Sequence, residues 1–352
     1  MRAGYAADMS RLRRVTAAMP GIARRRRGRG FSYEDAQGRP VHDDATLERI
    51  RTLAIPPAWN DVWICPDPSG HLQAVGTDAA GRRQYLYHDA WRSRRNVQKF
   101  RRVERFAEHL PELRATCNAA LRQRGLTRDK VLAAALRLLD EGSFRVGSES
   151  YARDNGTYGL ATLRREHASV DGDRVTFDFT AKSGKRHVQA IVEPRLARTV
   201  GALKRRRGGG RELLAFQQDG RWNDVRSTDI NDALHDMAGE DFSAKDFRTW
   251  QATVLAAVLL AEEERELTQI SSRRRGVTTV VREVAEHLGN TPAVCRTSYI
   301  DPRVIDAFMD GSTIAGAVRG IDLAAPFDLP VRERIERAVL DLLQGSISVA
   351  AA

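Results

Sequence analysis

Arginines and lysines in distinctive local contexts are the residues of this chain whose types and spacing could do chemistry. The sequence holds no Walker loop, no metal-ligand spacing and no Gly-Xaa-Ser-Xaa-Gly turn. Its glycine run at 208–210 follows arginines and opens no strand–helix–strand unit, so it does not indicate dinucleotide binding. We therefore expect a reaction built from cations and a nucleophile, without a metal or a nucleotide cofactor.

Five short segments carry the candidate residues. They are FRVGSESY at 144–151 followed by NGTYGLATL at 155–163, DFTAKSG at 178–184, SAKDFRTW at 243–250, LGNTP at 288–292 and RTSYIDP at 296–302. In this order they resemble the small, poxvirus-like and bacterial type IB DNA topoisomerases, over Arg29 to Arg303. Each segment alone is a weak signal, whereas all of them in the family's order are highly specific.

The resemblance implies a role for each of five positions. Tyr299 matches the nucleophile, and Arg145 and Arg248 match the first and second catalytic arginines. Lys182 matches a lysine at a hairpin tip, with Lys185 as a nearby competitor for that role. Asn290 stands where many members carry His. An Asn can donate a hydrogen bond to a phosphate oxygen, but it cannot carry a proton or a charge.

The same set of residue types has a physical rationale. Attack of a phenol on a phosphodiester adds negative charge to the nonbridging oxygens, which the forked donors of two guanidiniums match well. The departing 5′ alkoxide needs a proton, and a lysine whose pKa is lowered by burial and neighbouring cations can supply it. A phosphotyrosine conserves the energy of the broken bond, so resealing needs no ATP.

Further residues are predicted to contact duplex DNA, the substrate that the resemblance implies. Lys245 resembles the topoisomerase pattern and suggests a supporting contact to the scissile phosphate, and Tyr151 matches a phosphate-contacting tyrosine. The segment that contains Gln84, Tyr85 and Tyr87 resembles a family segment that touches DNA in the major groove. A Gln can read an adenine edge, and a Tyr hydroxyl can contact phosphate.

Composition supports a polyanionic partner and a reducing compartment. The 352 residues carry 57 Lys and Arg against 46 Asp and Glu, a net charge of +11, which favours nucleic acid or an anionic surface. The three cysteines have no close spacing, so neither a disulfide framework nor a zinc site is indicated. No apolar run is long enough for a membrane span or a signal peptide, and we expect a cytoplasmic, nucleoid-associated location.

The hydrophobic pattern predicts an α+β protein, with a small, mainly β domain before a larger, mostly α catalytic domain that contains a β-hairpin. Residues 1–28, which include RRRR at 24–27, are predicted to be a basic flexible arm. Residues 29–90 are predicted to be the β domain, with strands at 61–65, 72–76 and 83–88. Residues 91–345 are predicted to form the catalytic domain, with hairpin strands at 175–180 and 187–192, and 346–352 a tail.

Other interpretations remain open at this stage. A lone Tyr299 is typical of a half-buried packing residue, and Arg145 and Arg248 of surface ion-pair partners. A tyrosine recombinase uses nearly the same chemistry, although Lys245 stands where recombinases usually carry His. A noncatalytic DNA-packaging protein could also have kept the fold. The complete set of residues favours a topoisomerase, which we expect to clamp duplex DNA as a monomer.

Overall fold

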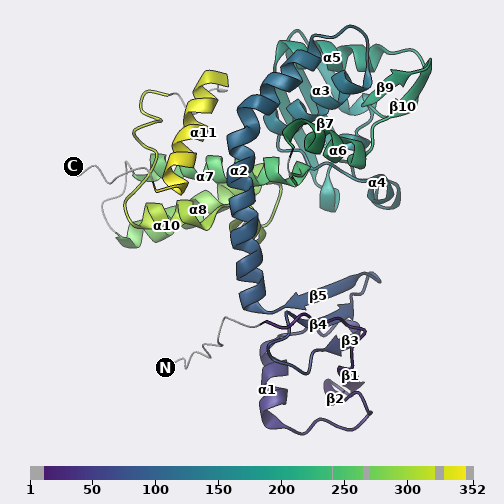
Figure 1. Cartoon of the computed structure of the whole chain (residues 1–352), viewed down its shortest axis with the longest axis vertical. Coiled ribbons are helices and arrows are strands. Elements are labelled where there is room, and N and C mark those ends of the chain that lie inside the picture. The colour runs from purple at the N-terminus through teal and green to yellow at the C-terminus, as the bar shows by residue number, and fades with distance from the viewer. Residues whose placement is uncertain (1–11, 240, 265–269, 322–328, 346–352) are drawn as a thin grey trace. The chain divides into compact units, whose positions relative to one another are not determined.

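The computed structural model describes residues 12–239, 241–264, 270–321 and 329–345. The chain divides into two units, Met1–Lys99 and Phe100–Ala352, and the boundary falls inside the long helix α2 (Asp89–Leu121) (Figure 1). The sequence-based boundary at residue 90 lies where this helix begins. Residues 1–11 of the predicted arm and the predicted tail at 346–352 lie outside the described residues.

An antiparallel five-stranded sheet forms the first unit, in the order β2-β1-β3-β4-β5. Its strands are β1 (Ile22–Arg27), β2 (Gly30–Glu34), β3 (Asn60–Ile64), β4 (Leu72–Thr77) and β5 (Arg83–Tyr87), and its helix is α1 (Asp44–Thr52). Ile22, Ile50, Ile64 and Ala74 form a small core between sheet and helix. The three strands predicted in this region are confirmed as β3, β4 and β5.

The prediction of a flexible basic arm is wrong for residues 22–27, because they form strand β1. Ile22 is buried in the core of this unit, and β1 pairs with β2 and β3. Arg24 donates to the carbonyl oxygens of Ile55, Pro56 and Trp59 at 3.2, 3.0 and 2.7 Å. Its guanidinium also lies 4.1 Å from the ring centroid of Phe31. A run of arginines can therefore form a strand when one side chain finds acceptors inside the unit.

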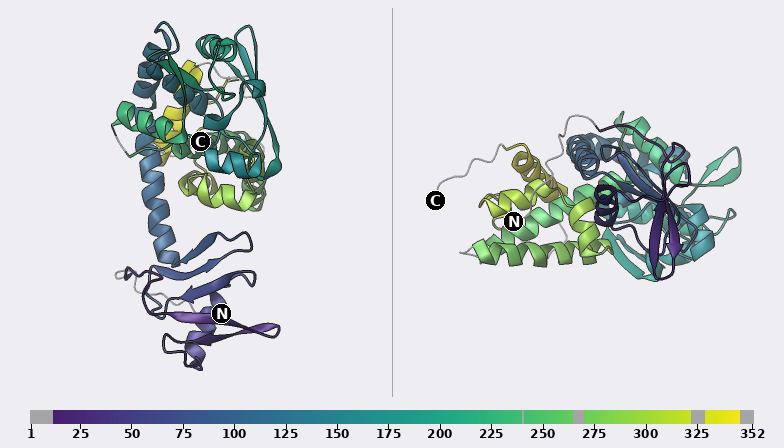
Figure 2. Two further views of the ribbon diagram at one scale, coloured as in Figure 1. Left: turned by 90° about the vertical axis from the view of Figure 1, so that its right-hand side faces the viewer. Right: turned by 90° about the horizontal axis from the view of Figure 1, so that it is seen from below.

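The second unit is mostly helical. Helix α2 continues into it as one helix, which is seen along its length in the left view of Figure 2. The further α-helices are α3 (Arg128–Glu141), α4 (Glu149–Asn155), α5 (Pro194–Arg205), α6 (Ser227–Ala238), α7 (Ala244–Glu264), α8 (Ile270–Leu288), α9 (Pro292–Ser298), α10 (Pro302–Met309) and α11 (Leu329–Leu343). The predicted α+β class, with a β-rich region before a mostly helical domain, is confirmed.

Two small antiparallel sheets accompany these helices. One contains β6 (Ala168–Asp171), β7 (Arg174–Thr180) and β8 (Arg186–Val192), and the other pairs β9 (Ala215–Gln218) with β10 (Arg221–Asp224). Strands β7 and β8 confirm the predicted hairpin, and the short 3-10 turn η3 (Lys182–Gly184) joins them. Ser183 takes a left-handed backbone conformation there, with φ of 67°, which lets the chain reverse within a few residues.

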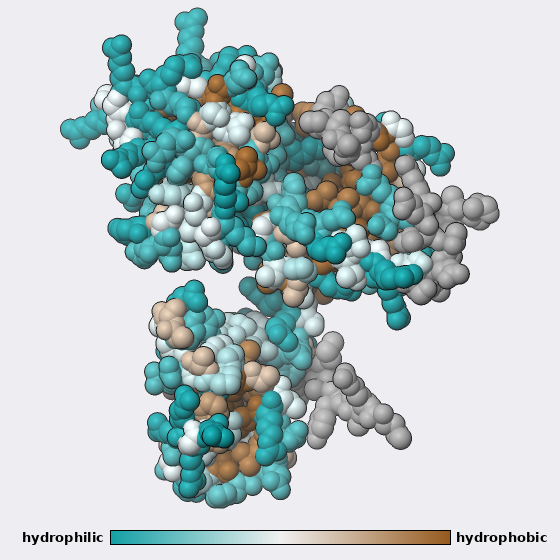
Figure 3. Space-filling view, turned by 180° about the vertical axis from the view of Figure 1, so that it is seen from behind, coloured by the Kyte–Doolittle hydropathy of each residue, from teal (hydrophilic) through white to brown (hydrophobic). Residues whose placement is uncertain are grey.

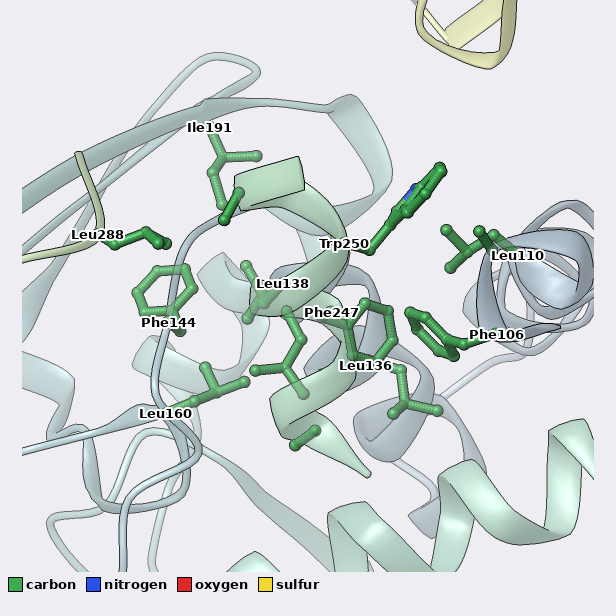
Figure 4. Packing of buried hydrophobic residues seen from close by; sticks show 14 of the residues in the cluster. Phe106, Leu110, Leu136, Leu138, Phe144, Leu160, Ile191, Phe247, Trp250 and Leu288 are labelled. Atoms are coloured by element: carbon green, nitrogen blue, oxygen red, sulfur yellow. The ribbon is translucent and has the colours of Figure 1, made fainter. Parts of the chain in front are cut away.

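Helix α7 passes through the centre of the second unit and is buried on most of its surface. Its Phe247 packs edge to face against Phe106 of α2, with ring centroids 4.8 Å apart. Trp250 of α7 is 1% exposed, and Leu136 and Leu138 of α3 complete this part of the core (Figure 4). Such close packing fixes α7 firmly, so a functional side chain on this helix has a well-defined position.

One face of each unit is mainly polar. Figure 3 shows hydrophilic residues over most of the visible face of each unit. No helix within the described ranges is both long and apolar enough to span a bilayer.

Candidate active site

Arg248 lies on the first turns of α7 and is 3% exposed. Its Nη1 donates to the carbonyl oxygen of Ser143, and its Nη2 donates to that of Leu288 at 2.9 Å. Burial, and then the charge of Arg145, lower the pKa of Arg248 to about 10. Because both of these acceptors are uncharged carbonyl groups, they orient the guanidinium without neutralising it.

Arg145 comes to the same place from the loop between α3 and α4. Its Nη2 donates to the carbonyl oxygen of Gly289 at 3.0 Å and to Oδ1 of Asn290 at 2.6 Å. Partial burial lowers its pKa, and the nearby Tyr299 opposes that lowering. The end of α8 thus supplies acceptors for both arginines, since the last carbonyls of a helix have no partner within it and carry partial negative charge.

The side-chain amide of Asn290 uses only one of its two polar atoms in hydrogen bonds among the described residues. Its Oδ1 accepts from Arg145, whereas its Nδ2 is buried and has no hydrogen-bond partner among the described residues. A buried donor without a partner is costly unless a ligand completes it. The left-handed turn residue at this helix end is Gly289, with φ of 61°. A left-handed backbone conformation therefore does not account for the presence of an asparagine at position 290.

Tyr299 is the residue that ends α9 and is half-buried. Its ring centroid lies 5.5 Å from the guanidinium carbon of Arg248 and 5.6 Å from Nζ of Lys245. Thr253, one and a half turns after Arg248 on α7, donates from Oγ1 to the carbonyl oxygen of Tyr299 at 3.2 Å. Two cationic side chains therefore lie close to the phenol that is predicted to be the nucleophile.

Lys182 stays apart from this cluster. It lies in η3 at the exposed tip of the β7–β8 hairpin, and within the described residues its ammonium group makes no hydrogen bond or ion pair. The same hairpin does approach the arginines through His187 on β8. Burial lowers the pKa of His187, and the charges of Arg248 and Arg145 lower it further.

The predicted DNA-contacting residues are distributed over both units. In the second unit, Lys245 lies beside Tyr299, and Tyr151 lies on α4 with 39% of its surface exposed. In the first unit, Tyr85 and Tyr87 share an exposed face of the edge strand β5, with ring centroids 6.3 Å apart. Gln84 points to the opposite face, since neighbours along a strand alternate, and its Nε2 donates to Asp78 at 2.9 Å.

Sequence comparison identifies the family of this chain. Residues 88–310 match the profile described as eukaryotic DNA topoisomerase I, catalytic core, which covers well over half of the chain. The chain belongs to the type IB DNA topoisomerase family. Residues 30–78 also match the N-terminal domain of bacterial DNA topoisomerase IB. The match at 88–310 contains the positions predicted to be catalytic, namely Arg145, Lys182, Arg248, Asn290 and Tyr299.

Viral relatives match most of the length of the chain. DNA topoisomerase 1B of Acanthamoeba polyphaga mimivirus is 30% identical over 290 residues, which are 80% of this chain and 85% of the relative. DNA topoisomerase 1B of Vaccinia virus (strain Copenhagen) is 21% identical over 277 residues, 77% and 85% of the two chains. DNA topoisomerase 1 of Rabbit fibroma virus (strain Kasza) is 24% identical over 317 residues, 83% and 91%.

Three residues that touch the site were not predicted from the sequence. Ser143 accepts from Arg248 through its carbonyl oxygen, and His287 makes a hydrogen bond to the Ser143 hydroxyl group. Thr253 holds the backbone of Tyr299. These contacts join segments far apart in the sequence, and no local motif could have indicated them.

Proposed function

We propose that this chain relaxes supercoiled duplex DNA by cutting one strand with Tyr299, letting the strand rotate and resealing it. The observation that carries the proposal is the arrangement of Arg145, Arg248 and Lys245 around the Tyr299 ring. Both arginines have carbonyl or amide acceptors rather than carboxylates at the end of α8. Their charge is therefore available to a phosphate.

The proposed cleavage step is a transesterification. The Tyr299 oxygen attacks phosphorus, the bond from phosphorus to the 5′ oxygen breaks, and a 3′-phosphotyrosine forms. Arg145 and Arg248 stabilise the charge that grows on the nonbridging oxygens, and the Asn290 Nδ2 donates to one of them. Resealing is the same step in reverse, so it consumes no ATP and needs no metal.

Lys182 is proposed to give a proton to the departing 5′ oxygen. Its place at the tip of a hairpin leaves the ammonium free to approach the scissile phosphate once DNA lies against the second unit. The hairpin tip reverses through the adjacent Ser183, whose backbone is left-handed.

Further parts of the proposal concern binding. Lys245 and Tyr151 in the second unit, and Gln84, Tyr85 and Tyr87 in the first, are proposed to contact duplex DNA. The net charge of +11 favours such a substrate. We propose that the protein clamps DNA as a monomer, in the cytoplasm and associated with the nucleoid.

The decisive experiment is relaxation of supercoiled plasmid in EDTA without ATP, together with trapping of the covalent adduct. Wild-type protein should relax the plasmid and form a protein–DNA band that survives denaturation. Tyr299→Phe should still bind DNA but form no band. A wild-type protein that neither relaxes plasmid nor forms the band would overturn the proposal, and exchange of strands between two marked duplexes would indicate a recombinase instead.

A further inference from the structure

Ser143 connects three separate elements at the back of the two arginines. It is 3% exposed and lies two residues before Arg145. Its carbonyl oxygen accepts from Arg248 of α7, and its hydroxyl lies 2.9 Å from Nε2 of His287 of α8. Its backbone N–H donates to Oε1 of Gln189 of β8 at 3.3 Å. Every hydrogen-bonding group of Ser143 is thus used, each toward a different element.

His287 lies at the end of α8, next to the residues that accept hydrogen bonds from the two arginines. It immediately precedes Leu288, Gly289 and Asn290, the residues whose oxygens hold the two guanidiniums. The hydrogen bond between His287 and Ser143 therefore ties this end of α8 to the loop that carries Arg145. The two residues that it joins are 144 positions apart in the sequence.

The surroundings of His287 favour its neutral form. Burial lowers the pKa of His287, followed by the charges of His187 on β8 and Arg248 on α7. On α9, Cys295 lies near Arg248, and burial raises the pKa of its thiol to about 11, so this thiol is neutral at neutral pH. A neutral imidazole with its proton on Nδ1 accepts at Nε2 from the Ser143 hydroxyl.

We propose that Ser143 and His287 are positioning residues, whose mutual hydrogen bond holds Arg248 and Arg145 in register for the scissile phosphate. The proposal rests on the proposed function of this site. Neither side chain touches Tyr299, and both act through the arginines. Because a shift of about 1 Å in a catalytic group can cost ~10² in rate, losing this bond should slow cleavage without weakening DNA binding.

Two substitutions at one position test the hydrogen bond itself. His287→Leu removes the hydrogen-bond partner of the Ser143 hydroxyl, and we expect single-turnover cleavage of a duplex oligonucleotide to slow by about 10-fold to 100-fold, with an unchanged dissociation constant for DNA. His287→Gln can place an amide oxygen near the position of Nε2, and should keep most of the wild-type rate at pH 7.5. Ser143→Ala should match the leucine variant.

The pH profile supplies a readout that a purely structural role would not change. Because burial and nearby cations lower its pKa, His287 takes up a proton only below its ordinary pH range. Its Nε2 then becomes a donor, and the imidazolium adds a buried positive charge near Arg248. Cleavage by the wild type should therefore weaken on the acid side, and His287→Gln should weaken less. The part that remains belongs to His187, which also lies near Arg248 and Arg145.

His109→Gln is the matched control. His109 lies on α2, forms a hydrogen bond with the carbonyl oxygen of Arg105 at 2.8 Å and packs against the ring of Phe242, so its replacement should leave cleavage and its pH profile unchanged. Equal rates for His287→Leu and wild type, or a loss confined to DNA affinity, would overturn the positioning role. If His287→Leu fails to fold, Ser143→Ala and His287→Gln still decide the question.

Failure of this inference differs from failure of the proposed function. If wild-type protein forms no covalent adduct, the topoisomerase proposal itself falls. If the wild type forms the adduct and the Ser143 and His287 variants form it equally fast at every pH, only the positioning role falls.

Discussion

Two buried arginine clusters lie in the second unit, and they differ in what surrounds the guanidiniums. Arg114 of α2 donates to both carboxylate oxygens of Asp140 at 2.9 Å, and to Glu336 of α11 at 2.7 and 2.8 Å. Arg248 and Arg145 instead donate to carbonyl groups and to one amide. The first cluster is neutralised within the protein, and the second is not.

The pKa values follow this difference. Burial alone lowers the pKa of Arg114, but the carboxylates of Asp140 and Glu336 outweigh it and raise the pKa above its ordinary value. Burial and Arg145 lower the pKa of Arg248 to about 10. A buried arginine that is paired with carboxylates links the helices that carry them. A buried arginine whose acceptors are carbonyl groups keeps a positive charge that a ligand can use.

Arg114→Met tests the structural cluster. Removing this guanidinium leaves the carboxylates of Asp140 and Glu336 buried with fewer partners, and we expect the free energy of unfolding to fall by about 3–5 kcal/mol. Denaturant unfolding of the full chain measures the change. Cleavage per folded molecule should stay close to wild type, and a large loss there would erase the distinction between the clusters.

Arg248→Ala tests the other cluster. Without this guanidinium the transition state loses one charge-stabilising group, and we expect single-turnover cleavage to slow by ~10²–10³. The carbonyls of Ser143 and Leu288 lose a donor, so some stability is lost as well. Adduct formation measured below the unfolding temperature separates the two effects. Wild-type cleavage by this variant would mean that its charge serves only the fold.

Asn290→Asp would place a carboxylate in the Arg248 and Arg145 cluster and make it resemble the Arg114 cluster. A carboxylate at this position can pair with Arg145, neutralise part of the site and repel the DNA phosphate. We expect cleavage to slow by about 10-fold to 100-fold, while thermal stability stays equal or rises. Asn290→Ala provides the comparison, because it removes the amide donor without adding charge. If the aspartate variant cleaves faster than the alanine variant, repulsion is not the cause.

Acid should weaken the Arg114 cluster, because this cluster depends on the ionised carboxylate of Asp140. Although burial raises the pKa of Asp140, the cations of Arg332, Arg114 and Arg137 outweigh it and hold this pKa well below its usual range. The stabilisation from this carboxylate is therefore complete above about pH 4 and is lost as pH falls toward the lowered value. Unfolding free energy should drop by up to ~1.4 kcal/mol per pH unit there. Arg114→Met, which relieves part of the lowering, should show a shallower slope.

Much of the site was predictable because its residue types and order are distinctive. Tyr299, Arg145, Arg248 and Lys245 were each placed from short segments, and the structure brings them together. Lys182 was predicted at a hairpin tip, and η3 confirms that local position. Strands β3, β4 and β5 were predictable because alternation and flanking turns are local signals.

What the sequence could not indicate depends on hydrogen bonds between distant segments. Strand β1 was taken for an arm because its arginines suggested solvent, while the carbonyl oxygens that receive Arg24 come from the segment before β3. Ser143 and His287 have ordinary local contexts, and only the fold brings them to 2.9 Å. The two arginine clusters likewise look alike in sequence. They differ in their hydrogen-bond acceptors, which are carboxylates around Arg114 and carbonyl or amide oxygens around Arg248 and Arg145.

The contact between Thr253 and Tyr299 has a mechanical consequence. Thr253 is buried, donates to the carbonyl oxygen of Tyr299 and accepts from the backbone N–H of Asp301 at 3.1 Å. While a cut strand swivels, the proposed phosphotyrosine would carry the tension of the DNA into the backbone at this point. That tension would pass into α7, the helix that also holds Arg248, so that nucleophile and arginine would shift together and stay aligned for resealing.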